Sequence, residues 1–400
     1  MTKNIHVPYG LSVHGQEEID AVIEVLKTST QMGARTRRLE ERIAAMFDKK
    51  HGIMVNSGTS ALYVAVEALG IPAGAEVITP ALTFSSTVSC LVKNGLIPAF
   101  VDVAPNTFCI DTAQMEEMLS DKTKAVLAPN LIGNVCEWEA IHTFCQKHGL
   151  LIIEDSADTL GATLNGRSSG AWSDASITSF YGSHIINGAG NGGMLCLNDD
   201  GAADQSRLLR SWGRNSSLFK DSEKIEDRFN VELDGIPYDA KFVFSVPGYQ
   251  LEPSEISAAF ALVQLGKLED NMRAREENFA RLTEFLGNYE AYFTLPQQTP
   301  NTRTNWLAYP LVIRDDAPFT RRDMQIFLEQ RNIQTRVIFT GNILRQPGFK
   351  NISARVRDGG YPVADQVMRG GVLLGCHQGI TDAMRSHVFQ TIAAFLSQGK

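Results

Sequence analysis

The sequence predicts an α/β protein with a large, mostly parallel sheet domain and a smaller C-terminal α/β domain. Three observations support this prediction. From about residue 50 to residue 200, short runs rich in β-branched residues alternate with longer amphipathic runs, which is the pattern of βαβ units. Polar residues begin where each apolar run ends. The chain has 400 residues, 44% hydrophobic and 20% charged, which is enough for two packed domains.

The strands of the larger domain are predicted from short apolar runs. They cover residues 52–55, 76–79, 99–101, 125–128, 150–153 and 175–178. In a parallel sheet, ligands collect at the carboxyl ends of the strands, so we expect the polar segments after these strands to converge on one cleft. Those segments are residues 56–58, 80–85, 129–130, 154–155 and 179–184.

The rest of the chain completes both domains. Residues 254–286 form a predicted helical connector, and beyond it a strand at 308–313 and a helix at 381–396 indicate the smaller domain. We therefore assign residues 1–286, with the N-terminal segment and the connector, to the larger domain, and residues 287–400 to the smaller one.

Composition excludes several classes of partner. A net charge of -8 argues against nucleic acid and anionic membranes, because neither attracts an acidic surface. The opening residues lack a signal-peptide run, and no apolar stretch approaches the roughly 18 residues of a membrane span, so we expect a cytoplasmic protein. Six dispersed cysteines without a CxxC pair predict no zinc site and no disulfide framework. We expect most of them to be buried thiols.

A candidate phosphate site follows the first predicted strand. Gly58, Thr59 and Ser60 lie at the start of a helix predicted over residues 61–69. Glycine lets the backbone approach an anion, the hydroxyls donate hydrogen bonds, and the helix start adds unpaired N–H groups. Plain helix capping by serine or threonine explains the same residues equally well.

Asp155 is a candidate anchor for a heteroaromatic ring. It closes the apolar strand 150–153, where a carboxylate is partly desolvated unless it is paired with a cation. A protonated pyridine nitrogen is such a cation, and Phe84 is placed to stack on the same ring. The alternatives are a capping aspartate and a core phenylalanine.

His184 stands where the surrounding pattern calls for a lysine. The segment Ser179-Phe180-Tyr181-Gly182-Ser183-His184, with the glycine-rich run 187–193, resembles the cofactor-lysine segment of the sugar-nucleotide aminotransferases, a family of pyridoxal phosphate (PLP) enzymes. A histidine there forms no Schiff base, but it can carry a proton near neutral pH. The exchange favours proton shuttling over amino transfer. A purely structural histidine is the alternative.

The resemblance to this aminotransferase and dehydratase family covers nearly the whole chain. The matching segments, in order, are Gly58-Thr59-Ser60, Pro80 with Phe84, Glu154-Asp155, Ser179-Phe180, Pro247-Gly248-Tyr249, Ala258-Ala259 and Gln264-Leu265. A second set of segments resembles the 3-dehydratase branch, which acts on nucleotide-linked 4-keto-6-deoxyhexoses. This set is His184, Arg210-Ser211-Trp212-Gly213-Arg214, Thr340-Gly341-Asn342 and Arg345-Gln346-Pro347.

The resemblance implies an aspartate aminotransferase-like fold (PLP fold type I), a homodimer with shared active sites, and pyridoxamine phosphate (PMP) or PLP as cofactor. It implies L-glutamate as amino donor and a nucleotide sugar as substrate. It assigns His184 as the acid/base group. The implied cofactor-binding residues are Gly58, Thr59, Ser60, Phe84, Asp155, Asp158, Ser179 and Gln250. The candidate substrate-binding residues are Arg214, Asn342, Arg345 and His377, of which His377 has a satisfied structural histidine as its alternative.

Three departures from the family pattern stand out. Where the CDP-sugar branch has cysteines for a [2Fe–2S] cluster, this chain has residues 215–218 and Ser156-Ala157, so the cluster ligands are absent and no metal is predicted. Gln250 replaces a usual asparagine. Glu252 replaces a usual arginine or lysine, which weakens the expectation that glutamate renews PMP.

Two other functions stay open from the sequence. One is another PMP- or PLP-dependent elimination on a sugar or nucleotide sugar, which Glu252 accommodates. The other is a catalytically silent paralogue that binds the cofactor, which loss of the lysine alone would favour. Retention of Asp155, Phe84 and Thr59 favours a cofactor that is used.

Overall fold

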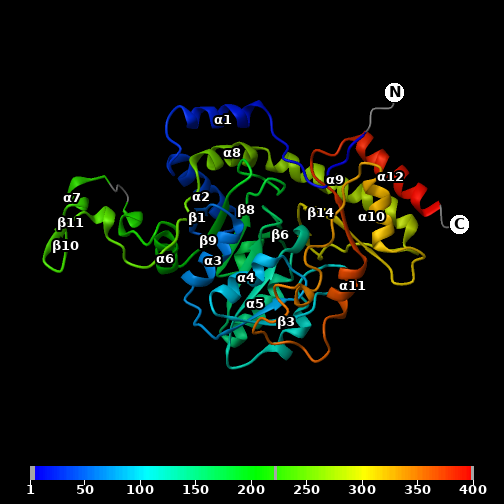
Figure 1. Ribbon diagram of the computed structural model, residues 1–400, viewed down its shortest axis with the longest axis horizontal. Helices are drawn as coiled ribbons and strands as arrows, with labels where there is room; N and C mark the ends of the chain where they lie inside the picture. The colour runs from blue at the N-terminus through cyan, green and yellow to red at the C-terminus, as the bar shows by residue number, and fades with distance from the viewer. Residues whose placement is uncertain (1–4, 220–222, 398–400) are drawn as a thin grey trace.

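A seven-stranded sheet forms the centre of the computed structural model, which describes residues 5–219 and 223–397 (Figure 1). The strand order is β1-β9-β8-β5-β4-β2-β3. All neighbours from β8 to β3 pair in parallel, and β9 lies antiparallel between β1 and β8. The strands are β1 (His51–Val55), β2 (Glu76–Pro80), β3 (Ile97–Val101), β4 (Thr123–Pro129), β5 (Leu151–Ser156), β8 (Ala175–Ser179) and β9 (Gly193–Leu197).

The six predicted strands are confirmed, and β9 was not predicted. The glycine-rich run 187–193 returns the chain directly into β9, whose four residues after Gly193 are apolar. All five residues of β9 are buried because strands flank it on both sides. The buried antiparallel strand therefore reads as one apolar run, without the alternation that marks an exposed strand.

Helices cover both faces of the large sheet, as expected for a parallel sheet. On one face, α3, α4 and α6 pack against side chains such as Val77 and Ile153. On the other face, α5 packs near Ile152, and α2 and α8 pack near Met54. These helices are α2 (Ala34–Met46), α3 (Gly58–Ala68), α4 (Ser85–Lys93), α5 (Trp138–His148), α6 (Asp200–Arg210) and α8 (Glu255–Gly266).

The smaller domain is built on a three-stranded antiparallel sheet in the order β12-β14-β15. The long helix α9 (Leu268–Leu286) leads into it from α8. Its elements are β12 (Phe293–Thr294), β14 (Ala308–Ile313), α10 (Arg321–Glu329), α11 (Pro362–Gly370), β15 (Gly371–Gly375) and α12 (Asp382–Ser397).

Contacts cross the predicted domain boundary at residue 286 in both directions. Val7, which the sequence assigned to the larger domain, pairs with Ile333 of the smaller one. In the other direction, β13 (Thr302–Arg303) pairs with β6 (Thr163–Leu164) of the larger domain, which also pairs with β7 (Arg167–Ser168). The N-terminal segment continues into α1 (Gln16–Leu26), which packs on α8.

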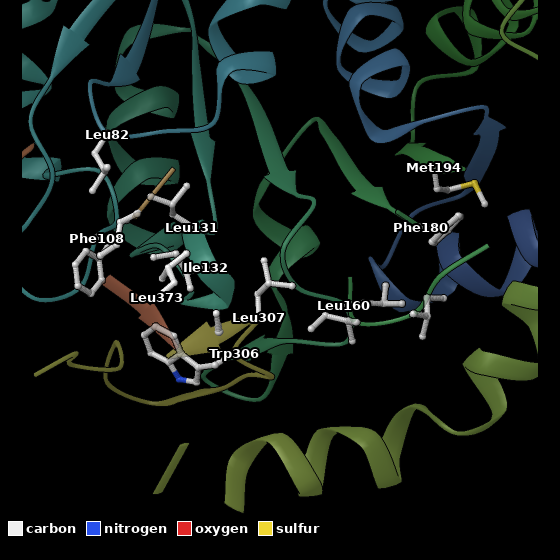
Figure 2. Packing of buried hydrophobic residues seen from close by; sticks show 14 of the residues in the cluster. Leu82, Phe108, Leu131, Ile132, Leu160, Phe180, Met194, Trp306, Leu307 and Leu373 are labelled. Carbon is white, nitrogen blue, oxygen red and sulfur yellow. The ribbon is translucent and has the colours of Figure 1, made fainter. Parts of the chain in front are cut away.

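One hydrophobic cluster joins the two domains. It extends from Phe180 and Met194 at the large sheet to Trp306 and Leu373 beside the small sheet (Figure 2). The ring of Phe279 on α9 stacks on Trp306 with 4.5 Å between centroids. Continuous apolar packing of this kind fixes the relative position of the domains, because separating them would expose it to water.

Residues 211–219 and 223–250 belong to an arm that projects from the body of the molecule at the left of Figure 1. It contains α7 (Ile225–Arg228) and the hairpin of β10 (Val231–Leu233) and β11 (Ile236–Tyr238), and the sequence did not predict it. Its exposed large apolar side chains are Trp212, Leu218, Ile225, Phe229, Leu233, Ile236, Tyr238, Phe242, Phe244 and Tyr249. An apolar surface of this extent marks an interaction site.

All six cysteines are free and buried, as predicted. Among residues 5–219 and 223–397, no helix combines the length and the apolar character that crossing a membrane requires.

We expect Gly193→Ala to lower the free energy of unfolding by about 1–3 kcal/mol, the range for overpacking a filled site. A Cβ at Gly193 would lie 2.4 Å from the backbone nitrogen of Gly58 and from the carbonyl of Ser57, neither of which can yield without moving the start of α3. Urea denaturation measures the change. The control is Gly266→Ala in α8, whose Cβ meets nothing within 4 Å. Equal stability of the Gly193→Ala variant and the parent would contradict the packing described.

Candidate active site

The start of α3 forms one end of the candidate site. The Ser57 hydroxyl caps the helix by accepting a hydrogen bond from the Ser60 N–H at 3.0 Å, and the Ser60 hydroxyl donates to the Asn56 amide oxygen at 2.6 Å. Gly58 packs against Ser179 at the end of β8, where a Cβ on Gly58 would lie 2.7 Å from the Ser179 Cβ. Thr59 is exposed. The structure thus brings Gly58, Thr59 and Ser179 together at a helix start, while Ser60 uses its hydroxyl within the turn.

Asp155 is a buried carboxylate without a cation. Its Oδ2 accepts a hydrogen bond from the Thr87 hydroxyl at 2.8 Å, and its Oδ1 accepts one from the Ala157 N–H at 3.2 Å. In the part of the chain that the structure describes, no lysine, arginine or histidine forms an ion pair with it. Burial raises the pKa of Asp155 to about 6, although both hydrogen bonds act to lower it. A cationic ligand would satisfy this group.

The neighbouring carboxylate of Glu154 has a different role. It is fully buried and accepts hydrogen bonds from Asn130, Ser156 and Ser176 at 2.6–3.0 Å. These three donors occupy the carboxylate, which is therefore not available to a ligand. Glu154 instead links strands β4, β5 and β8. Its charge also contributes to the raised pKa of Asp155.

Asp158 lies near Asp155 in the loop after β5. It is half-buried, and its Oδ2 accepts a hydrogen bond from the Ile132 N–H at 2.8 Å. Burial raises the pKa of Asp158 to about 7, and the charge of Asp155 raises it further. The two carboxyl groups therefore share one electrostatic environment.

Phe84 lies close to this pair because it precedes α4, the helix that carries Thr87. Phe84 occupies the N-cap position, and its side chain is 52% exposed. Its ring meets the ring of Phe339 from the smaller domain edge to face, with 5.8 Å between centroids. Thr87 was not predicted. The sequence feature that could have indicated Thr87 is a hydroxyl side chain in the first turn of a helix that begins at the carboxyl edge of the sheet.

His184 presents an unpaired nitrogen to the interior. Its Nδ1 is buried and has no hydrogen-bond partner among the described residues. Burial lowers the pKa of His184 to about 4, and the charge of Arg275 lowers it further, while the backbone at Ser179 and Ala157 raises it. The imidazole is neutral at physiological pH.

Arg275 on α9 is a functional candidate that sequence reasoning missed. Its guanidinium is fully buried and donates to the carbonyl oxygens of Trp306 and Leu307 and to the side chain of Gln378, each at 3.0 Å. Its Nη2 is buried without a partner. Burial lowers the pKa of Arg275 to about 10, so it remains a cation near His184. An arginine in an amphipathic helix carries no sequence signal of such a position.

The N-terminal segment also reaches the site. Gly10 packs against Ser183, next to His184, where a Cβ on Gly10 would lie 2.8 Å from the Ser183 Cβ. Burial and the charge of Asp158 both raise the pKa of Tyr9, and the Arg336 guanidinium lies 5.4 Å from the centre of its ring. None of these contacts was predicted, because the partners are at least 149 residues away in the sequence.

The candidate substrate residues of the smaller domain form one group with Asp365. The Asn342 amide donates to Asp365 Oδ1 at 2.8 Å, and the Arg345 guanidinium donates to both carboxylate oxygens at 2.6 Å. Backbone pairing of Leu82 with Asn342 holds this group beside the end of β2 and close to Phe84. Arg345 thus already has an acidic partner.

His377 has the contacts of a structural histidine. Its Nε2 bonds to the carbonyl oxygen of Pro8 at 3.1 Å, and its Nδ1 accepts a hydrogen bond from the Gly379 N–H at 3.2 Å. The ring is buried, which lowers the pKa of His377 to about 4. With both nitrogens bonded to backbone, the ring offers nothing to a substrate, in agreement with the structural alternative.

Gln250 and Arg214 lie at the base of the arm. The backbone of Gln250 pairs with Ser211, its side chain is exposed, and the next carbonyl, that of Leu251, accepts from the Asn56 N–H at 2.9 Å beside the start of α3. The Arg214 guanidinium lies over the rings of Trp212 and Phe242. In the described part of the chain, neither residue forms a hydrogen bond or an ion pair with His184 or Asp155.

At the positions where the resemblance places the cluster cysteines of the CDP-sugar branch, this chain has Ser216, Leu218 and Ala157. Its six cysteines are buried at other positions.

Comparison with known proteins identifies the family of the chain. A model of the DegT/DnrJ/EryC1/StrS aminotransferase family matches residues 13–393. The chain is 33% identical over 402 residues to the dTDP-4-dehydro-2,6-dideoxy-D-glucose 3-dehydratase of Saccharopolyspora spinosa, covering 98% of this chain and 86% of the relative. It is 29% identical to the GDP-perosamine synthase of Caulobacter vibrioides, over 92% of each chain.

The solved structure of E. coli GDP-4-keto-6-deoxy-D-mannose-3-dehydratase with bound hydrated PLP has the same fold. Its TM-score is 0.87 at 26% identity, covering 97% of this chain and 100% of that chain. This likeness confirms the aspartate aminotransferase-like fold, and together with the match over residues 13–393 it shows that the chain belongs to the DegT/DnrJ/EryC1/StrS aminotransferase family.

Proposed function

We propose that this protein is a PMP-dependent 3-dehydratase that removes the C3 hydroxyl of a nucleotide-linked 4-keto-6-deoxyhexose. The observation that carries the proposal is the buried, unpaired Nδ1 of His184, in the segment where the related aminotransferases have lysine. Relatives named as 3-dehydratases for a dTDP-sugar and a GDP-sugar support this reaction class. The GDP-perosamine synthase is related at a similar identity, so likeness to known proteins alone does not decide the reaction class.

The residues at the site fit PMP or PLP. Asp155 is a buried carboxylate that lacks a cation, and a protonated pyridine nitrogen would supply one. The exposed Thr59 hydroxyl, Ser179 and the N–H groups at the start of α3 suit a phosphate. Phe84 would cover the ring, and Asp158 would face its hydroxyl. When bound, PMP supplies a free amine for the sugar's 4-keto group and an electron-withdrawing ring.

His184 would move the proton in this reaction. Because burial lowers its pKa to about 4, the imidazole is unprotonated and ready to act as a base. As the acid/base group, His184 would accept one proton and deliver a proton to the departing C3 hydroxyl, while the bound cofactor would supply the electron-withdrawing ring. A lysine at the same position would instead bond to PLP and favour amino transfer. Histidine therefore selects dehydration.

We further propose a cytoplasmic homodimer with shared active sites. The exposed apolar side chains of the arm need a cover, and a second copy of the chain would provide one. In this arrangement Gln250 would reach the partner's cofactor phosphate. L-glutamate would renew PMP, and Arg214, Asn342 and Arg345 would contact the nucleotide sugar, Arg345 after exchanging Asp365 for the substrate.

One observation favours a second candidate. Glu252 stands where relatives of this type carry a cation, so a PMP- or PLP-dependent elimination that needs no carboxylate-bearing amino donor would suit the chain equally. The direct test is incubation with a panel of nucleotide-linked 4-keto-6-deoxyhexoses and PMP. Mass spectrometry would show a 3-deoxy product that has lost one oxygen atom, with PMP converted to PLP in the same turnover, if the first proposal is right.

We expect His184→Asn to keep the cofactor and to lower dehydration about 10²- to 10⁴-fold, because a positioned acid/base group contributes that much to the rate. The measurements are kcat for water loss and the absorption spectrum of the bound cofactor. The control is His6→Asn, at an exposed histidine. Dehydration at the parent rate in His184→Asn would remove this residue from the mechanism.

We expect Asp155→Asn to stabilise the cofactor-free protein at pH 8 and to weaken its binding of PMP. The folded protein raises the pKa of Asp155 to about 6 from about 3.9 in an unfolded chain, so it binds this proton more tightly than the unfolded chain does. The stabilisation that the protonated carboxyl of Asp155 contributes is fully present below about pH 4 and is lost as the pH rises through 6. The gain at pH 8 is therefore up to about 3 kcal/mol.

Thermal unfolding of the cofactor-free proteins at pH 5 and pH 8 measures this difference. Thr143→Val, on an exposed helical turn, is the control for a surface change that leaves Asp155 intact. A stability difference between Asp155→Asn and the parent that does not grow with pH would contradict the buried, unpaired carboxylate.

We expect Glu252→Arg to speed the formation of PMP from PLP and L-glutamate, since a charge-assisted contact to the donor carboxylate contributes about 1.5–3 kcal/mol, or roughly 10- to 150-fold. The rate is followed by the absorbance change of the cofactor. Glu252→Gln removes the negative charge without adding a cation and should give a smaller gain. If the parent already uses glutamate efficiently and Glu252→Arg adds nothing, another residue holds the donor.

A further inference from the structure

The chain just before Phe84 is hydrogen-bonded to the smaller domain. The carbonyl oxygen of Thr83 accepts two hydrogen bonds from Thr340, one from the hydroxyl at 2.6 Å and one from the N–H at 3.4 Å. Two residues earlier, the carbonyl oxygen of Ala81 accepts one from the Ile343 N–H at 2.9 Å. The backbone that leads into Phe84 is therefore fixed by a domain that lies far away in the sequence.

The turn before Thr340 holds Phe339 in one position. The φ angle of Phe339 is +43°, in the left-handed region that a bulky residue rarely adopts. Two residues later, Gly341 has a φ of +61°, and a Cβ there would lie 2.5 Å from the Cγ of Met368 on α11. The side chain of Gln346 donates to the carbonyl oxygen of Thr340 at 2.8 Å. Such a backbone persists only where the surroundings enforce it, and it is concentrated at ligand sites.

The Phe339 ring meets the Phe84 ring edge to face. The ring centroids are 5.8 Å apart, and the planes are inclined by 79°. Phe339 is half-buried and packs against the hydrophobic cluster that joins the two domains, whereas Phe84 is 52% exposed and is not part of that cluster. In the part of the chain that the structure describes, no other aromatic ring contacts Phe84. Phe339 is thus the anchored member of the pair.

Phe84 is also joined to the carboxylate of the candidate site. Its carbonyl oxygen accepts a hydrogen bond from the Thr87 N–H at 3.3 Å in the first turn of α4, and the Thr87 hydroxyl donates to Asp155 at 2.8 Å. The exposed ring and the hydroxyl that bonds to Asp155 therefore belong to one helical turn. The place of the ring relative to Asp155 depends on this turn and on Phe339.

We propose that Phe339 is a positioning residue, which holds the Phe84 ring where it stacks on the cofactor and so couples docking of the smaller domain to cofactor binding. The inference rests on the cofactor contact proposed for Phe84 and does not depend on the sugar that is processed. A ring that is already held loses little rotamer freedom when a ligand stacks on it, so the ligand binds more tightly. Because Phe84 remains exposed, the restraint leaves surface for the ligand.

The test is titration of the cofactor-free, full-length protein with PMP by isothermal titration calorimetry. The proteins compared are the parent, Phe339→Leu, Phe84→Leu and the double variant. Phe339→Leu should weaken PMP binding about 2- to 10-fold, the range for loss of an edge-to-face aromatic contact. In the Phe84→Leu background the same substitution should have no further effect, because Phe339 acts through Phe84.

Three further variants serve as controls. Phe339→Tyr keeps the ring and should bind PMP like the parent. Phe395→Leu removes a half-buried ring whose edge-to-face partner, Phe319, also lies in the smaller domain, and it should also bind like the parent. Thr340→Val keeps both rings but removes the hydroxyl that bonds to the Thr83 carbonyl oxygen. It should weaken PMP binding in the same direction, so the inference is tested even if Phe339→Leu does not fold.

Circular dichroism of bound PMP gives a second readout. A planar ring acquires such a signal only from asymmetric contacts, so at saturating PMP the signal should change in Phe339→Leu and stay unchanged in Phe395→Leu. The inference is overturned if Phe339→Leu binds PMP as tightly as the parent. It is also overturned if this substitution weakens binding equally in the parent and in the Phe84→Leu background, since Phe339 would then support the fold and not the Phe84 ring. Binding like the parent by Thr340→Val would overturn the coupling to domain docking.

The outcomes separate this inference from the proposed function. A parent that shows the coupling between Phe339 and Phe84 but dehydrates no sugar supports the inference and refutes the dehydratase. A parent that dehydrates a nucleotide sugar, while Phe339→Leu weakens PMP equally in both backgrounds, does the reverse. If Phe84→Leu binds PMP as tightly as the parent, the ring contact and this inference both fail, and the panel of sugars still decides the reaction.

Discussion

An uncompensated carboxylate, Asp155, is the constraint on which the arrangement of the site depends. It sits at the carboxyl end of β5 inside the protein, where two hydrogen bonds satisfy part of it and no cation neutralises it. Keeping such a group ionised in the interior costs free energy, and a cationic ring would recover it on binding. The strand β8 beside β5 carries other candidate residues, including Ser179 at its end and, in the loop that follows, His184.

The groups around His184 set its protonation state. Burial and the nearby cation of Arg275 both favour the neutral imidazole, and the unpaired Nδ1 leaves an acceptor free. Arg275 is itself held by the carbonyl oxygens of Trp306 and Leu307 at the junction of the domains. The state of the proposed base is therefore tied to the packing of the smaller domain, far from His184 in the sequence.

Two further parts of the chain lie near the candidate site. The N-terminal segment crosses from Ile333 of the smaller domain to Ser183 in the loop after β8, so it links the two domains. The arm leaves the body on the other side with its apolar surface uncovered. A family fold that supports both synthases and dehydratases can thus vary its chemistry at one loop position and its substrate contacts on segments that the central sheet does not constrain.

The sequence by itself determined the six parallel-direction strands, the order of the polar segments at their ends and the family, because β-branched runs and turn residues are local signals. It also marked Asp155 and His184. Tertiary structure alone decided the insertion of β9, the arm, the position of Arg275 and the approach of Tyr9, and it showed that both nitrogens of His377 are bonded to backbone. These features depend on contacts between residues far apart in the chain, and burial, which shifts each pKa at the site, exists only after the chain has folded.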